Sequence, residues 1–93
     1  MENINICNTV YRADTIPFAG INIMVIQGGK GMLGCGYLNL AAAEKFGHAL
    51  AIVSGVANYE DMLCAVITGC SSAAAELGVT PGMTGKDALL LMK

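Results

Sequence analysis

A glycine-rich stretch, residues 28–39, separates a strand-like first part of this chain from a second part rich in helix signals. It reads GGKGMLGCGYLN, so five of its twelve residues are glycine. Glycine accepts positive φ angles and close backbone contacts that other residues do not, and clusters of it mark turns. The stretch therefore restricts where the chain can turn, and the elements on either side must fit around it.

Apolar segments before and within this stretch predict β-strands. Residues 3–11 (NINICNTVY) alternate apolar and polar side chains, as in a strand with one wet face. Residues 13–17, which end in a proline, are expected to break that strand. Residues 20–26 (GINIMVI) are β-branched and nearly all apolar, as in a central strand covered on both faces. Residues 28–29 then predict a tight hairpin turn into a third strand over residues 31–35.

A strand–helix–strand unit follows. Asn39 is a favourable N-cap for a helix over residues 40–46, which Gly47 would end in the left-handed conformation. A short fourth strand is expected over residues 49–54. This order of elements predicts a right-handed parallel crossover between the third and fourth strands.

The last forty residues predict helices. Asn58 with Asp61, and Thr84 with Asp87, resemble capping pairs, and Thr68 could cap a helix between them. The expected helices run through about residue 65, over residues 69–77 and over residues 88–92. The chain is thus expected to form a single domain, residues 1–93, of the α/β (α+β) class. Its mixed sheet would have about four strands: an N-terminal hairpin region, then β-α-β, then two to three C-terminal helices.

Composition predicts self-association. Hydrophobic residues make up 55% of the chain and charged residues only 13%, against a usual charged fraction of about 25%. A domain of this size has a thin core, so more apolar surface is present than the core can hide. Large exposed apolar patches usually mark interfaces. We therefore expect a homo-oligomer, either a dimer or a larger assembly.

Charge and spacing argue against several other classes of protein. The five basic residues are scattered and the net charge is −2, which does not fit a nucleic-acid partner. No apolar run approaches the roughly 20 residues that span a bilayer, and asparagines interrupt residues 1–12, so we expect neither a membrane partner nor export. The expected location is the cytoplasm. The four cysteines lack metal-site spacing and the chain has one histidine, so no metal or cofactor is expected.

Residues 29–34 spell G-x-G-x-x-G, but this pattern does not have the context of a dinucleotide site. Such a site needs a helix that opens directly on the glycine loop, and here a strand is expected to intervene. We interpret the pattern as a consequence of glycine content in a hairpin.

Cys35, between Gly34 and Gly36, is the candidate reactive residue. Flanking glycines allow close approach to a thiol, and the helix expected after Asn39 could stabilise a thiolate. Nucleophilic catalysis would also need a nearby base, for which His48, Lys30 and Tyr37 are the candidates. The alternative is a small buried thiol at a strand end, since cysteine is among the most buried residue types.

Three segments carry a family resemblance: GYLN after Cys35, IVSGVANYEDML, and AAELGVTPGMTGKDALL. From about Gly20 to the C-terminus the chain resembles the YunC-like family, small bacterial and archaeal proteins of unknown function. The resemblance implies a compact α/β domain and draws attention to Cys35 and the loop over residues 34–39. It supplies no activity, because none is established for the family.

Three functional hypotheses follow. The first is a small binding or accessory module that homo-oligomerises, with a small-molecule ligand or a partner near Gly34, Gly36 and Asn39. The second is a thiol-dependent enzyme that uses Cys35 as its catalytic residue. The third is a structural subunit of an oligomer with no site of its own.

Overall fold

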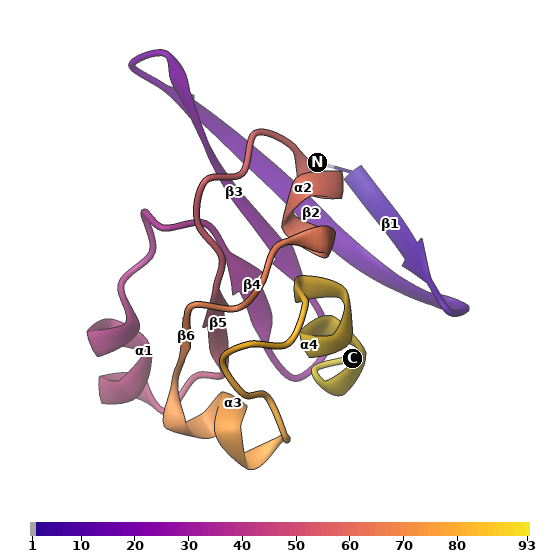
Figure 1. The fold of residues 1–93 in the computed structure, drawn as a ribbon, viewed down its shortest axis with the longest axis vertical. Helices are drawn as coiled ribbons and strands as arrows, with labels where there is room; N and C mark the ends of the chain where they lie inside the picture. The colour runs from indigo at the N-terminus through magenta and orange to yellow at the C-terminus, as the bar shows by residue number, and fades with distance from the viewer. Residues whose placement is uncertain (1) are drawn as a thin grey trace.

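The computed structural model describes residues 2–93 and contains one mixed β-sheet with helices on both faces (Figure 1). The six strands lie in chain order: β1 (Glu2–Ile6), β2 (Thr9–Phe18), β3 (Ile21–Gln27), β4 (Met32–Gly34), β5 (Leu50–Ile52) and β6 (Gly69–Cys70). The helices are α1 (Leu40–Phe46), α2 (Tyr59–Cys64), α3 (Ser72–Glu76) and α4 (Gly85–Leu91). Only β4 and β5 pair in parallel. The α+β class is confirmed, with six strands where about four were expected.

Two tight hairpins build the first half of the sheet. The turn residues Cys7 and Asn8 have φ values of 49° and 65°, and Ala19 and Gly20 have values of 50° and 82°. Each pair forms a two-residue loop, with positive φ at both positions as in type I′ turns, whose twist matches that of the flanking strands. The strand predicted over residues 3–11 is therefore divided by a turn.

The predicted break over residues 13–17 is wrong, because these residues continue β2. Pro17 is tolerated there because it pairs with Asn22 of β3 and can occupy a position that donates no hydrogen bond to that strand. The expectation that β3 is covered on both faces is also wrong. Met24 and Ile26 are buried on one face, whereas Ile21 is 38% exposed.

The glycine-rich segment after β3 is a four-residue loop, not the two-residue turn that was predicted. Gln27 pairs with Met32, and the N–H of Gly28 donates to the carbonyl of Gly31 at 2.8 Å. Its glycines allow close packing against the C-terminus. A Cβ atom on Gly28 would lie 2.3 Å from the carbonyl oxygen of Met92, and one on Gly31 would lie 2.7 Å from the Met92 sulfur.

The parallel crossover is confirmed. The side chain of Asn39 accepts a hydrogen bond from the N–H of Ala41 at 2.8 Å, and Gly47 ends α1 with φ of 71°. Helix α1 packs on one face of the sheet, where Ala43 joins Leu50 and Ile52 in a small apolar cluster. Local capping therefore determines both ends of the crossover helix.

The C-terminal region departs from expectation at one element. Asn58 and Thr84 cap α2 and α4 as predicted. The helix predicted over residues 69–77 is wrong at its start, because Gly69 and Cys70 form β6 against β5. The cap of α3 is Ser71, not Thr68.

Ser71 also joins β6 and α3 to the rest of the sheet. Its side chain is 1% exposed, donates to the carbonyl of His48 at 2.7 Å and accepts from the N–H of Leu50 at 2.9 Å. Next to it, the N–H and the hydroxyl of Ser72 both donate to the carboxylate of Glu44 on α1. These bonds lower the pKa of Glu44 below its usual value.

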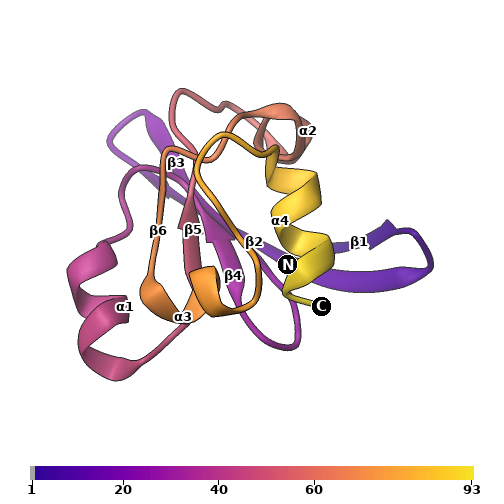
Figure 2. The same cartoon turned by 60° about the horizontal axis from the view of Figure 1, so that its bottom comes forward.

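The main core lies on the face of the sheet opposite α1, under α2, α3 and α4 (Figure 2). Tyr11 is fully buried there, and its hydroxyl donates to the carbonyl oxygen of Leu89 at 2.9 Å. Gly85 lets α4 approach α2 closely, because a Cβ atom on it would lie 2.1 Å from the carbonyl oxygen of Met62. Among residues 2–93, no helix is long and apolar enough to cross a membrane.

We expect Tyr11→Phe to lower the free energy of unfolding by about 1 kcal/mol at neutral pH, the usual net value of one hydrogen bond. The loss of stability is modest because the N–H of Met92 also donates to the Leu89 carbonyl.

Burial, and to a lesser extent the charge of Cys7, raises the pKa of Tyr11 above its usual value near 10.0. The protonated phenol is therefore favoured in the folded state, and its contribution is lost as pH rises through the raised pKa. Urea denaturation of both proteins from neutral to alkaline pH should show the Tyr11→Phe deficit shrinking above about pH 10. A deficit that stays constant with pH would contradict this assignment.

Ala19→Asn should stabilise the protein by about 0.5–1 kcal/mol, because it relieves an alanine held at positive φ and produces the Asn-Gly pair that type I′ turns prefer. Urea denaturation measures the change. Ala57→Asn is a matched control at an exposed loop alanine outside the left-handed region. Equal effects of the two substitutions would show that the turn geometry is not the cause.

Candidate functional site

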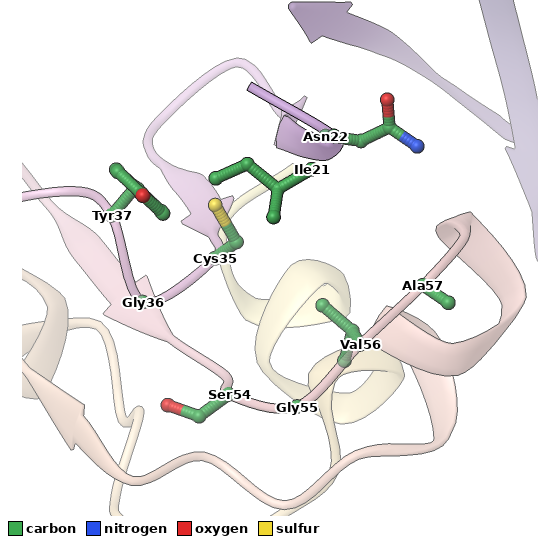
Figure 3. Close-up of a pocket in the computed structure, with 10 residues that line it drawn as sticks. Ile21, Asn22, Cys35, Gly36, Tyr37, Ser54, Gly55, Val56 and Ala57 are labelled. Atoms are coloured by element: carbon green, nitrogen blue, oxygen red, sulfur yellow. The ribbon is translucent and has the colours of Figure 1, made fainter. Parts of the chain in front are cut away.

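A pocket of about 530 Å³ lies where three loops of the sheet meet (Figure 3). Two of the loops leave the carboxyl ends of the parallel strands β4 and β5, and the third is the turn between β2 and β3. The lining residues are Gly20, Ile21, Asn22, Cys35, Gly36, Tyr37, Ser54, Gly55, Val56 and Ala57. Crevices at the carboxyl ends of parallel strands are the usual ligand sites of α/β sheets. The crossover through α1 brings the loops after β4 and β5 to the same edge of the sheet.

Cys35 forms part of the pocket wall directly after β4. Its N–H donates to the carbonyl of Met24 at 3.1 Å, and its own carbonyl accepts from the N–H of Leu38 at the same distance. These bonds hold the backbone of Cys35 in place. The residue is 6% exposed, and Figure 3 shows its sulfur beside Ile21. The small thiol therefore closes one side of the pocket against the hairpin turn.

Gly36 brings the loops after β4 and β5 into contact. A Cβ atom on Gly36 would lie 3.4 Å from the hydroxyl oxygen of Ser54. On the opposite loop, Gly55 turns the chain with φ of 71° and is followed by the half-buried side chain of Val56. A single Cβ atom at position 36 would therefore fit at ordinary van der Waals distance from Ser54, which shows how closely the two loops approach each other.

The pocket presents backbone donors and no charged side chain. Within residues 2–93, the N–H groups of Gly36, Tyr37, Ser54, Gly55 and Val56 donate to no protein acceptor. The polar side chains at the lining are the phenol of Tyr37, the hydroxyl of Ser54 and the amide of Asn22. Such a lining suits a largely apolar molecule that carries hydrogen-bond acceptors.

The four residues predicted for the site separate into two pairs. Cys35 and Gly36 line the pocket, whereas Gly34 and Asn39 lie outside its lining. Gly34 packs against Leu38, whose Cδ1 atom would lie 2.1 Å from an added Cβ atom. Asn39 uses its side chain to cap α1. Gly34 and Asn39 therefore shape the loop and the helix that follow Cys35.

Of the three candidate partners for the Cys35 thiol, only Tyr37 lines the same pocket. Lys30 and His48 line a second pocket of about 320 Å³, together with Gln27 and Ala49. That pocket lies at the amino ends of β4 and β5. The ring of His48 lies 6.1 Å from that of Phe46. In the described part of the chain, no group of three or more His, Cys, Asp or Glu side chains is placed to hold a metal ion.

Sequence reasoning missed the other two loops of the pocket. Residues 54–57 follow the predicted fourth strand, and its expected parallel pairing could have indicated them as a ligand-binding edge. Residues 20–22 carried no comparable signal, because the Ala19-Gly20 turn has an alanine where glycine or asparagine is usual.

Comparisons with known proteins place this chain among uncharacterised relatives. It is 30% identical over 86 residues to the uncharacterised protein YunC of Bacillus subtilis (strain 168), covering 88% of this chain and 85% of that protein. The fold matches the crystal structure of a protein of unknown function, TA1206, from Thermoplasma acidophilum. That match has a TM-score of 0.94 and 29% identity, and it covers 99% of this chain and 90% of the other.

The family model described as a domain of unknown function, DUF1805, matches residues 34–92. This range contains the pocket loops after β4 and β5, and it begins after the β2–β3 hairpin. The match covers more than half of the chain and agrees with the relative and with the solved structure. The chain belongs to the DUF1805 family and is a YunC-like protein.

Proposed function

We propose that this protein is a small binding module whose ligand occupies the pocket beside Cys35. The observation that carries this proposal is the pocket of about 530 Å³ at the carboxyl ends of the two parallel strands. Its volume falls within the roughly 300–1,000 Å³ typical of small-molecule sites. Its lining is apolar or neutral, with free backbone donors at the two loops.

The chemistry of the lining defines the class of ligand. Ile21 and Val56 supply apolar walls, and Tyr37, which is 62% exposed, offers an aromatic face. The amides of Gly36 and Gly55 would donate to carbonyl-type acceptors. The ligand is a neutral, flat or aromatic molecule with one or two acceptor groups, because no charged side chain lines the pocket to balance an ionic ligand.

Homo-oligomerisation and a cytoplasmic location are part of this proposal. Eight large apolar side chains are exposed within residues 2–93, among them Val10, Ile16 and Phe18 at 60–61%. Association with a second copy would remove such surface from water. The four free cysteines suit a reducing compartment.

Thiol chemistry at Cys35 is the second candidate function, favoured by the place of the sulfur on the pocket wall. It ranks below ligand binding because neither Lys30 nor His48 lines this pocket, so no strong proton acceptor stands beside the thiol.

Binding can be tested with a library of neutral aromatic amides and ketones, observed through the amide resonances of the isotope-labelled protein. Ligands should shift the signals of Gly36 and Gly55 and leave those of Gly29 and Gly31, at the other end of β4, unchanged. Tyr37→Ala should weaken the binding about tenfold, through loss of an aromatic contact worth roughly 1–1.5 kcal/mol. Phe46→Ala is the control, since Phe46 is similarly exposed at 66% and lies outside this pocket. A library that moves no pocket resonance would count against the binding proposal.

Alkylation with iodoacetamide, read by mass spectrometry across a pH series, separates the two candidate functions. A binding module predicts that buried Cys35 reacts more slowly than exposed Cys7 and Cys64 at every pH. A thiol-dependent enzyme predicts the reverse order. Cys35 would then react well below about pH 8.5, which is the usual pKa of a free cysteine thiol. Selective reaction of Cys35 would therefore favour the thiol-dependent enzyme over the binding module.

A further inference from the structure

The β2–β3 hairpin extends beyond both neighbouring strands as a two-stranded arm (Figure 1). Strand β1 pairs with β2 only as far as Ala13, and β4 pairs with β3 only from Val25 onward. Residues 14–18 and 21–24 therefore pair chiefly with each other. An isolated two-stranded ribbon is at best marginally stable in water, so such an arm needs packing on its faces.

Only one face of the arm is packed within the chain. On that face Met24 is 2% exposed, and the hydroxyls of Thr15 and Tyr59 of α2 form a hydrogen bond. The register places the next set of side chains on the opposite face. We call the apolar part of this set the hairpin face; it comprises Ile16, Phe18, Ile21, Ile23 and Val25, while Arg12 and Asp14 lie on the same side of the sheet.

The hairpin face is apolar and open. Ile16 is 61% exposed, Phe18 60% and Ile21 38%, while Ile23 and Val25 are half-buried. Helix α1 lies on this side of the sheet but covers only β4 and β5, where Ala43 packs on Leu50 and Ile52. Residues 2–93 contain no element that covers the hairpin face.

The free edge of the arm does not favour strand addition. Pro17 lies near the end of the β2 edge and has no N–H to donate to an incoming strand, and the other free edge, at the start of β3, borders the pocket at Ile21 and Asn22. A partner would therefore meet the arm through its face and not through its edge.

We propose that a second copy of this chain packs on the hairpin face, the two copies being related by a two-fold axis. This inference rests on the proposed homo-oligomerisation and names its interface. A two-fold contact joins one patch to itself, so the patch must be self-complementary. The hairpin face itself is apolar, and the two charged residues on the same side of the sheet, Arg12 and Asp14, neutralise each other through a 3.0 Å ion pair. Two copies can therefore approach without an uncompensated charge in the contact.

The side of the sheet that carries the hairpin face gives a dimer room beyond these five apolar residues. Along the ten residues of β2, roughly 33 Å, and across three strands, roughly 14 Å, it has a projected area of roughly 450 Å², which includes Arg12 and Asp14. A standard interface buries about 800 Å² per partner. Protruding side chains add surface to this flat projection, and neighbours such as Val10 and Tyr37, which are 61% and 62% exposed, add more. Both increase the area that a dimer could bury toward the standard value.

The same face continues into the ligand pocket. Ile21 belongs to the hairpin face and also lines the pocket beside Cys35. A copy packed on the arm would hold the Ala19-Gly20 turn in place and cover the rim of the pocket at Ile21. Dimer formation and ligand binding would therefore both involve Ile21 and the turn beside it.

Light scattering after size-exclusion chromatography, over a dilution series, tests the interface. The wild-type protein should have twice the 9.6 kDa mass of one chain. Ile16→Lys should raise the dimer dissociation constant about tenfold or more, because it places a charge in the apolar contact. Val66→Lys is the matched control, since Val66 is 52% exposed and lies on the connection after α2, away from the arm. Circular dichroism confirms that each variant is folded.

Hydroxyl-radical footprinting of the wild-type protein provides a second test that needs no variant. The chain has two phenylalanines, Phe18 in the hairpin face and Phe46 at the end of α1, exposed at 60% and 66% in the single chain. Assembly should protect Phe18 and leave Phe46 reactive. A monomeric wild-type protein would overturn this inference together with the proposed oligomer. An oligomer in which Ile16→Lys has no effect and Phe18 stays reactive would overturn the interface alone, and ligand binding at the pocket would stand independently.

Discussion

The parallel pairing of β4 and β5 is the constraint on which the rest of this structure depends. Each strand has only three residues, yet together they carry both cores of the molecule. Leu33 and Ala51 face the main core, whereas Leu50 and Ile52 face α1. Parallel strands must be joined by a crossover, and the crossover puts the ends of both strands at one edge. The pocket lies at that edge because the two loops have to leave the sheet there.

Glycine serves this architecture mainly by allowing close approach. Gly28 and Gly31 lie against the C-terminal residues, and Gly85 lies against the backbone of α2. In each case an added Cβ atom would overlap a neighbouring atom. The glycine-rich segment after β3 thus joins the hairpin to the end of the chain, which explains its composition without a phosphate or nucleotide ligand.

The length of β2 connects the surface proposed for association with the pocket proposed for ligand binding. Because β2 continues beyond β1, the β2–β3 turn reaches the carboxyl end of β4 and forms the third wall of the pocket. The same extension leaves an apolar face that α1 does not cover. In a chain of 93 residues, one structural feature can therefore support both proposed properties.

Features that depend on neighbours within a few residues were predictable from the sequence. The capping of α1 by Asn39, of α2 by Asn58 and of α4 by Thr84 each involves a side chain and a backbone N–H two or three positions away. The strand–helix–strand crossover followed from the order of such local signals. Cys35 and Gly36 were identified as site candidates because of local glycine density, and they line the pocket.

Features that depend on contacts between distant residues were decided only by the tertiary structure. Strand β6 has two residues, too few for a periodic pattern, and it forms because Ser71 bonds to the chain at His48 and Leu50. The hairpin turns contain Cys7 and Ala19 at positive φ, a conformation that the pairing of the flanking strands imposes against local preference. The pocket unites residues 20–22, 35–37 and 54–57, which are separated by more than ten positions. Local propensity determined the helix ends and the crossover, whereas long-range strand pairing determined the sixth strand, the extended arm and the walls of the pocket.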